Sequence, residues 1–133
     1  MDIFLKKTLE ERDAFMLNPQ SLAFVGDAVY GLFIKSCVFI GSTAKSGSLH
    51  KQSVLKVKAT AQSEVLDKLE GFLTEREQDL VRRARNTKVN APSKKASLSE
   101  YMKSTAYEAL LGYLFVSGQS ERLKEILRLG EKE

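Results

Sequence analysis

The sequence predicts an all-α fold in a single domain that spans residues 1–133. No stretch alternates convincingly between apolar and polar residues, as a half-buried strand does, whereas apolar residues recur at helical spacing in several segments. The chain also has only two prolines, which leaves room for long helices. A chain of this length buries roughly two-thirds of the surface that its unfolded form exposes, enough for a core without disulfides or a structural metal.

The N-terminal half predicts three helices. A short amphipathic helix is expected over residues 3–15, with its apolar residues facing inward. A second, longer helix begins at Asn18-Pro19, because asparagine caps the free amides of the first turn and proline at the first helical position removes no needed donor. After a loop over residues 40–47, a third helix is expected over residues 48–69.

The C-terminal half predicts three more helices. Thr74 and Glu77, three residues later, have the pattern of a capping box at the start of a helix that ends in basic residues. After a polar loop, Ser97 or Ser99 is expected to cap a long helix. A last short helix is expected over residues 121–129.

The chain has one cysteine, Cys37, and one histidine, His50. An intramolecular disulfide is therefore impossible, and a catalytic cysteine–histidine pair or a histidine-rich metal cluster lacks the residues it needs. The apolar surroundings of Cys37 favour a packed, inert thiol. The N-terminus does not have the pattern of a signal peptide, and the longest apolar stretch, residues 22–34, contains Asp27 and is too short for a bilayer. We expect a cytoplasmic protein without a membrane partner.

Charge is distributed unevenly along this mildly basic chain, whose formal net charge is +4. No acid lies between Asp27 and Glu64, and none lies between Arg82 and Lys95, while both segments contain several basic residues. Two segments of one sign indicate a polyanionic partner. On charge alone, a solvated face with counter-charges nearby in space remains equally open.

Two acids, Asp27 and Glu108, lie in unusual surroundings. Every other residue of segment 22–34 is apolar, aromatic or glycine, and segment 105–115 resembles it. A helix that is apolar on nearly all faces belongs in the interior, so both carboxylates are expected in or beside the core. Buried carboxylates usually coordinate a cation, form pairs or have shifted pKa values, because leaving them unpaired is costly.

A glycine follows each acid by four residues, at Gly31 and Gly112. Glycine at these positions lets another helix or a substrate approach closely. The arrangement predicts two central helices packed face to face, with the two carboxylates converging. Hard oxygen ligands without histidine or thiolate favour Mg²⁺ or Mn²⁺ over zinc, and a cation beside a surface that attracts polyanions favours metal-assisted phosphodiester chemistry. Alternatively, each acid bonds a backbone amide or pairs with an internal lysine such as Lys103 or Lys35.

Two motifs resemble those of a known family. Leu22-Ala23-Phe24-Val25-Gly26-Asp27-Ala28-Val29 resembles the signature helix of the ribonuclease III family, and Thr105-Ala106-Tyr107-Glu108-Ala109-Leu110-Leu111-Gly112 resembles its second acidic motif. The basic stretch from Arg82 to Lys88, and a match that fills the chain without a C-terminal double-stranded-RNA-binding domain, are similar to the Mini-III branch. The resemblance implies a homodimeric helical endoribonuclease that matures large-subunit (23S) ribosomal RNA, and it allows for a ribosomal protein that presents the substrate.

The resemblance also implies site residues. Asp27 and Glu108 would be catalytic and would hold Mg²⁺, for which Mn²⁺ can substitute, and hydrolysis would leave a 5′-phosphate and a 3′-hydroxyl. The family's other acids are replaced here, by Gln20, Ala23 and Thr105. Phe24 takes the place of a residue that inserts into the partner subunit, although its pattern fits an ordinary core phenylalanine almost as well.

Double-stranded RNA is the expected substrate, held through phosphates and 2′-hydroxyls across the minor groove. The predicted RNA-binding residues are Arg82, Arg83, Arg85, Lys88, His50 and Lys51. Of these, His50 also fits the pattern of a plain surface or capping residue. Two other functions remain open: a catalytically silent RNA-binding module associated with ribosome assembly, and a helical protein-interaction domain.

Overall fold

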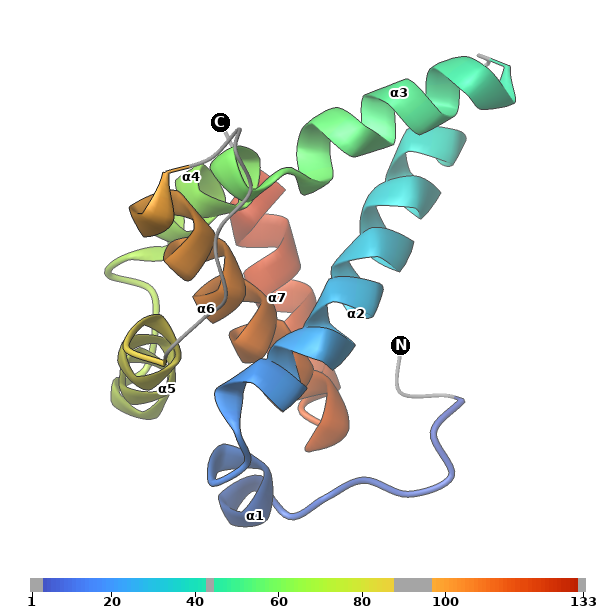
Figure 1. Ribbon diagram of the computed structural model, residues 1–133. Coiled ribbons are helices and arrows are strands. Elements are labelled where there is room, and N and C mark those ends of the chain that lie inside the picture. The colour runs from blue at the N-terminus through green and yellow to red at the C-terminus, as the bar shows by residue number, and fades with distance from the viewer. Residues whose placement is uncertain (1–3, 43–44, 88–96, 132–133) are drawn as a thin grey trace.

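The computed structural model describes residues 4–42, 45–87 and 97–131, and every regular element within these ranges is an α-helix (Figure 1). The predicted all-α class is therefore confirmed. The helices are α1 (Glu11–Phe15), α2 (Pro19–Ile40), α3 (Ser46–Val57), α4 (Ala59–Leu69), α5 (Glu75–Arg85), α6 (Leu98–Val116) and α7 (Ser120–Glu131).

Helices α2 and α6 form the centre of the fold. They cross each other, while α4, α5 and α7 pack against α6, and α3 runs back along the C-terminal half of α2 (Figure 1). Between residues 104 and 115, every residue of α6 is buried except Glu108. This confirms that this part of α6 is interior, and within it Glu108 is the one residue that reaches the surface.

The two central helices approach closely because each has a glycine at the crossing. A Cβ atom on Gly26 would lie 1.7 Å from the carbonyl oxygen of Glu108, and one on Gly112 would lie 1.9 Å from the carbonyl oxygen of Leu22. The predicted role of Gly112 is therefore confirmed. Gly31 makes no close helix contact among the described residues, because a Cβ atom there would meet nothing within 4 Å, and close approach of a substrate at Gly31 stays a prediction. Helix α2 makes its close contact through Gly26, the residue before Asp27.

Local capping signals set the starts of three helices as predicted. The side chain of Asn18 accepts a hydrogen bond from the first turn of α2, in which Pro19 is the first residue. Thr74 and Glu77 form a complete capping box at the start of α5. Of the two serines considered for α6, Ser97 is the cap. Each signal satisfies amides that the helix itself leaves without partners.

The helix predicted over residues 3–15 is much shorter in the structure, because α1 begins only at Glu11. Residues 4–10 are non-helical and run against the C-terminal end of α6. The Phe4 ring lies 5.6 Å from that of Phe115, centroid to centroid, and the Leu9 amide donates to the carbonyl of Val116 at 2.8 Å. Contacts with α6 therefore replace the contacts that an amphipathic helix would have made.

The single helix predicted over residues 48–69 is divided into α3 and α4. Lys58 has an extended backbone, with φ −61° and ψ 152°, so it ends α3 and starts α4. The break leaves the carbonyl of Val57 without its helical donor, and Gln62 Nε2 donates to that oxygen at 3.0 Å. The interruption thus has its own hydrogen bond, made by a side chain of α4.

One face of α2 packs against α6, and the other face contains large apolar residues among its polar ones. This outer face exposes Phe24, Leu32, Phe39 and Ile40. By length and composition, α2 is the one helix among the described residues that could cross a membrane, yet its inner face belongs to the core. Cys37 is exposed, so the expectation of a packed thiol is wrong. An apolar neighbourhood in the sequence did not distinguish the buried face of α2 from the exposed one.

Candidate active site

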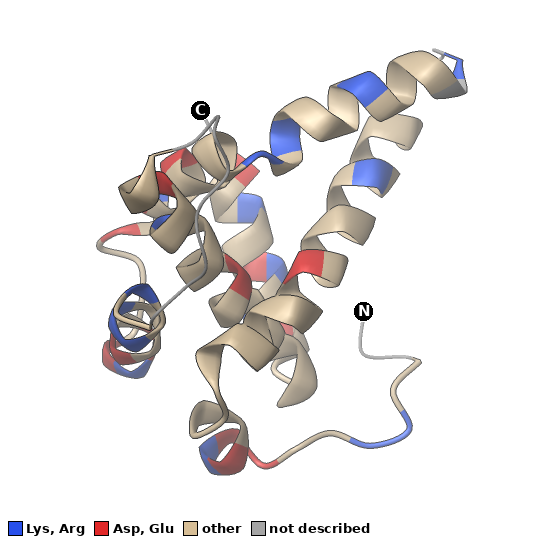
Figure 2. Ribbon diagram, viewed as in Figure 1, with Lys and Arg blue, Asp and Glu red and all other residues tan. Residues whose placement is uncertain are grey.

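The fold brings Asp27 of α2 and Glu108 of α6 together beside the glycine contact. Helix α2 carries one acidic and one basic residue, and its acidic position lies at the crossing with α6 (Figure 2). Burial, together with a hydrogen bond to Asp27 and the negative charge of Asp27, raises the pKa of Glu108 to about 9. The two carboxyl groups are thus close enough to share a proton, which agrees with the predicted convergence.

The two acids differ in exposure, which corrects part of the prediction. Asp27 is exposed rather than buried, and Glu108 is half-buried. Only one side of α2 is covered, so an acid beside Gly26 can sit at the crossing and still face solvent. The pair therefore has an inner and an outer carboxyl group, and the outer one is accessible to ions and substrate.

No lysine or arginine of the described residues pairs with Asp27 or Glu108. Lys103, considered as an internal partner, instead binds Asp67, with its Nζ 3.0 Å from Oδ1. Lys35, the other lysine considered, is exposed on α2. Within the described structure the carboxyl pair therefore has no basic partner, and a bound cation would supply the positive charge that the two carboxylates lack.

Sequence reasoning missed a third residue at this site, Gln62 of α4. Its side chain is buried, with 2% exposed, and its Nε2 lies 3.4 Å from Glu108 Oε2. The sequence contains a signal that could have identified it: Gln62 shares a helical face with Val65, Leu66 and Leu69, all of them buried. A polar residue at a core position of an amphipathic helix indicates a buried hydrogen bond.

The donor set fits a hard divalent cation. Among the described residues no group of three or more histidines, cysteines or acids lies close enough to hold a metal ion, which excludes the usual zinc arrangements there. Mg²⁺ is typically bound through one or two carboxylates and keeps several waters. Asp27 and Glu108 supply those two carboxylates, one of them open to solvent.

A third acid shows what a neutralised carboxylate looks like in this fold. Glu77 is buried, with 3% exposed, and Arg122 donates to both of its oxygens, at 2.9 and 2.7 Å. Burial raises the pKa of Glu77, but hydrogen bonds from Arg122 and Thr74 outweigh that effect and lower it below its ordinary value. Glu77 is thus a structural acid, whereas the carboxyl pair lacks any such partner.

Comparison with known proteins agrees with this geometry. Residues 20–119 match the family model described as the ribonuclease III domain. The chain belongs to the ribonuclease III family. It is 43% identical over 128 residues to the Mini-ribonuclease 3 of Thermoanaerobacter sp. (strain X514), covering 95% of this chain and 90% of that protein. It is 44% identical over 112 residues to the Mini-ribonuclease 3 of Symbiobacterium thermophilum, covering 84% of this chain and 86% of that protein.

A solved structure has the same fold. The crystal structure of a protein from Fusobacterium nucleatum superposes with a TM-score of 0.80 at 28% identity, covering 87% of this chain and 94% of that one. The resemblance to the Mini-III branch is therefore confirmed, and the chain is an endoribonuclease of the ribonuclease III family.

The predicted RNA-binding arginines of this ribonuclease differ in their surroundings. Arg82 and Arg85 are exposed at the wall of a cavity of about 810 Å³ between α4, α5 and α6. Arg83 points elsewhere: its Nη2 donates to the carbonyl of Phe15, and its guanidinium lies 4.7 Å from the centre of the Phe15 ring. The structure thus gives Arg83 a role in holding α1 to α5. Lys88 lies outside the described residues.

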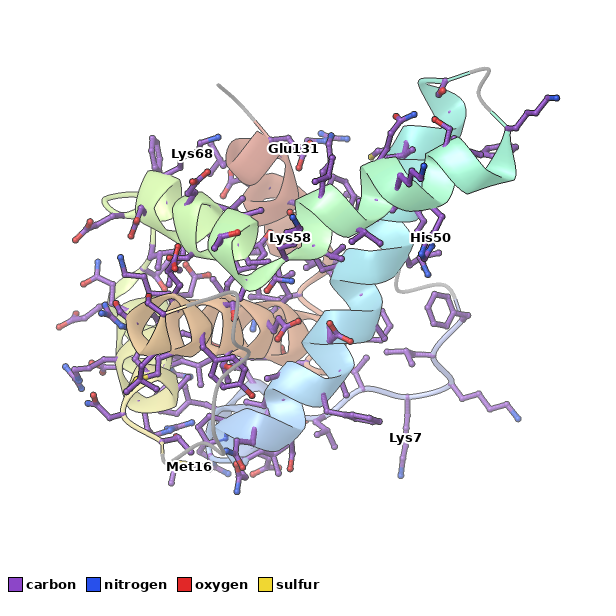
Figure 3. All side chains as sticks on the ribbon, turned by 45° about the horizontal axis from the view of Figure 1, so that its top comes forward. Lys7, Met16, His50, Lys58, Lys68 and Glu131 are labelled. Carbon is purple, nitrogen blue, oxygen red and sulfur yellow. The ribbon has the colours of Figure 1, made fainter. Side chains whose placement is uncertain are left out.

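His50 and Lys51 lie on α3, and His50 is labelled in Figure 3. His50 lines a cavity of about 640 Å³ with Phe39 of α2. Phe39 is twelve residues beyond Asp27, which corresponds to roughly 18 Å along a helix. Both α3 residues are exposed, and their contact with RNA remains a prediction.

Phe24 is one of the most exposed large apolar residues of the described structure, with 81% of its surface exposed. The alternative of an ordinary core phenylalanine is therefore wrong for the single chain. Phe24 projects from the outer, apolar face of α2, three residues before Asp27. An exposed aromatic residue on an apolar helix face is typical of a surface that another protein covers.

Proposed function

We propose that this ribonuclease cleaves double-stranded RNA in a Mg²⁺-dependent reaction and leaves a 5′-phosphate and a 3′-hydroxyl. The observation that supports this most directly is the pair Asp27 and Glu108, which converge at the α2–α6 crossing without a basic partner among the described residues. Mg²⁺ bound there would polarise the scissile phosphate and lower the pKa of the attacking water.

Glu108 and Asp27 have different roles in this proposal. Glu108 lies at the crossing, and its ionised carboxylate would be the inner ligand of the cation. Asp27 is exposed, so its carboxylate would be the ligand on the side from which a phosphate group can approach. Because backbone contacts at Gly26 fix the crossing, the fold sets the backbone positions from which the two carboxyl groups converge.

Binding of the duplex is assigned to the basic residues around α5. Arg82 and Arg85 are exposed, and Lys103 lies in the same cavity wall. A-form duplexes are recognised mainly through phosphates, 2′-hydroxyls and shape, so this surface requires little base specificity. Arg82 also has an ion pair with Asp79 at 2.9 Å, which a phosphate group would have to replace.

We also propose that the protein acts as a homodimer, with Phe24 at the interface and one active site for each RNA strand. The exposed apolar face of α2 supports this proposal, because a soluble monomer rarely leaves such a face uncovered. The natural substrate would be precursor 23S ribosomal RNA in the cytoplasm, in agreement with the Mini-III resemblance. A catalytically silent RNA-binding module is the alternative, and the following experiment distinguishes the two.

The test compares the wild type with Asp27→Asn on long duplex RNA, with and without Mg²⁺. The substitution keeps the shape of the side chain but removes its charge, so we expect duplex binding to be retained and cleavage to be lost. Asp13→Asn on α1, an exposed acid away from the crossing, is the matched control and should leave cleavage unchanged. A wild type that binds duplex RNA but leaves it intact at high protein concentration with Mg²⁺ would instead support the silent module.

A further inference from the structure

The side chain of Gln62 lies between the α3–α4 break and the active site. Its Nε2 donates to the carbonyl of Val57 at 3.0 Å and to Oε2 of Glu108 at 3.4 Å. The first bond ties the amide to a backbone atom at the end of α3, and the second reaches the inner carboxyl of the pair. Both N–H groups of the amide are thereby used, which fixes the plane of the side chain.

The third polar atom of this amide, Oε1, is buried and has no hydrogen-bond partner among the described residues. A buried polar atom without a partner costs roughly 1–3 kcal/mol. Leucine or methionine at this core position would avoid that cost, since the neighbours on the same face are Val65, Leu66 and Leu69. Packing alone therefore does not account for a glutamine here.

We infer that Gln62 is a positioning residue of the endoribonuclease site, which holds the Glu108 carboxylate in the orientation that a divalent cation shared with Asp27 requires. The bond from Gln62 to Oε2, together with its bond to the carbonyl of Val57, restricts the rotation of the Glu108 carboxylate at the crossing. This inference rests on the proposed metal-dependent function, because it assigns Gln62 a task only where a cation binds.

The experiment replaces the amide by apolar groups of similar size and measures metal binding directly. Gln62→Met keeps the unbranched shape, and Gln62→Leu provides a second packing of the same site. The matched control is Gln78→Met. Gln78 Nε2 also donates to the carbonyl five residues earlier, that of Leu73, at 3.0 Å, but within the described part of the chain it has no carboxylate partner. All variants are first checked by circular dichroism and thermal melting in EDTA.

The main readout is the dissociation constant of Mn²⁺ for each metal-free protein without RNA, from the electron paramagnetic resonance signal of free Mn²⁺. Groups that orient a metal ligand typically contribute 10–100-fold to affinity, so we expect binding weakened by about that factor in both Gln62 variants and unchanged in Gln78→Met. Cleavage of duplex RNA should fall through kcat, while KM for the RNA stays constant.

Three results would overturn the inference. Equal Mn²⁺ affinity in the wild type and the Gln62 variants would show that the amide does not position Glu108, even if cleavage falls. Unfolding of both variants in EDTA would mean that the bond to Val57 serves the fold. A wild type that binds no Mn²⁺ and leaves duplex RNA intact would remove the proposed function as well, so the two failures are distinguishable.

Discussion

Replacing Glu108 by glutamine should stabilise the metal-free protein while abolishing cleavage. The pKa of Glu108 is raised to about 9, from an ordinary value of 4.5. At about pH 7.5 the folded protein therefore carries a proton on Glu108 that the unfolded chain does not. Glutamine is neutral in both states and can still donate to Asp27 and accept from Gln62.

The magnitude follows from the proton taken up on folding. Each pH unit above 4.5 costs about 1.4 kcal/mol until the pKa of the folded state is reached, so at about pH 7.5 the wild type loses up to about 4 kcal/mol. Because folding raises the pKa of this acid, the wild type has its full stability below pH 4.5, and its free energy of unfolding falls as the pH rises toward about 9. For a domain of this size, 1 kcal/mol corresponds to roughly 4 °C in Tm.

The assay is thermal or urea unfolding in EDTA, followed by circular dichroism from about pH 4.5 to pH 8.5. We expect Glu108→Gln to equal the wild type at the acidic end and to be increasingly more stable as the pH rises. Excess Mg²⁺ should then stabilise the wild type and leave the variant unchanged. Glu64→Gln, at an exposed position of α4, is the control and should show no such pH-dependent gain. If Glu108→Gln is less stable than the wild type at every pH, the reasoning from an unpaired, half-buried carboxyl group is refuted.

Three further predictions concern the crossing, the structural ion pair and the outer face of α2. Gly26→Ala should unfold or strongly destabilise the protein, because its Cβ atom would lie 1.7 Å from a carbonyl oxygen. Gly31→Ala should instead raise the Tm slightly through helix propensity, and equal Tm values for the two variants would contradict the close crossing. Arg122→Met leaves Glu77 buried without its partner and should lower the free energy of unfolding, measured in urea, by about 3–5 kcal/mol. A loss below about 1 kcal/mol would mean that water replaces the arginine. Phe24→Glu should shift the protein from dimer to monomer in sedimentation experiments without lowering the Tm of the monomer, and an unchanged mass would place any interface elsewhere.

Features encoded by neighbouring residues could be predicted from the sequence. Asn18 with Pro19, and Thr74 with Glu77, are complete within one helical turn, and the structure has both at the expected places. The carboxyl pair could also be anticipated, because an acid in an apolar helix stands out whatever its partner is. In each case the signal and its physical cause lie in the same short segment.

Features that depend on distant partners could not be predicted in this way. The break at Lys58 involves a side chain of ordinary helix propensity, and it becomes understandable only when Gln62 is seen to bond both Val57 and the active site. The glycine spacing favoured Gly31 as the contact of α2, but the geometry of the crossing selects Gly26. The outer face of α2 contains the polar residues of the helix and also Phe24, Leu32, Phe39 and Ile40, so hydropathy did not separate these exposed apolar side chains from the buried ones.

The comparison between Glu77 and Glu108 indicates how this fold tolerates its active site. Both are glutamates in contact with the core. Arg122 donates a hydrogen bond to each carboxylate oxygen of Glu77. Among the described residues, Glu108 accepts one long hydrogen bond from Gln62 and lies beside a second carboxyl group. An arginine beside Glu108 would stabilise the metal-free fold, but it would also occupy the place of a cation. We therefore expect stability and metal binding to oppose each other at this crossing, with the core of α6 and the Glu77–Arg122 pair offsetting the loss.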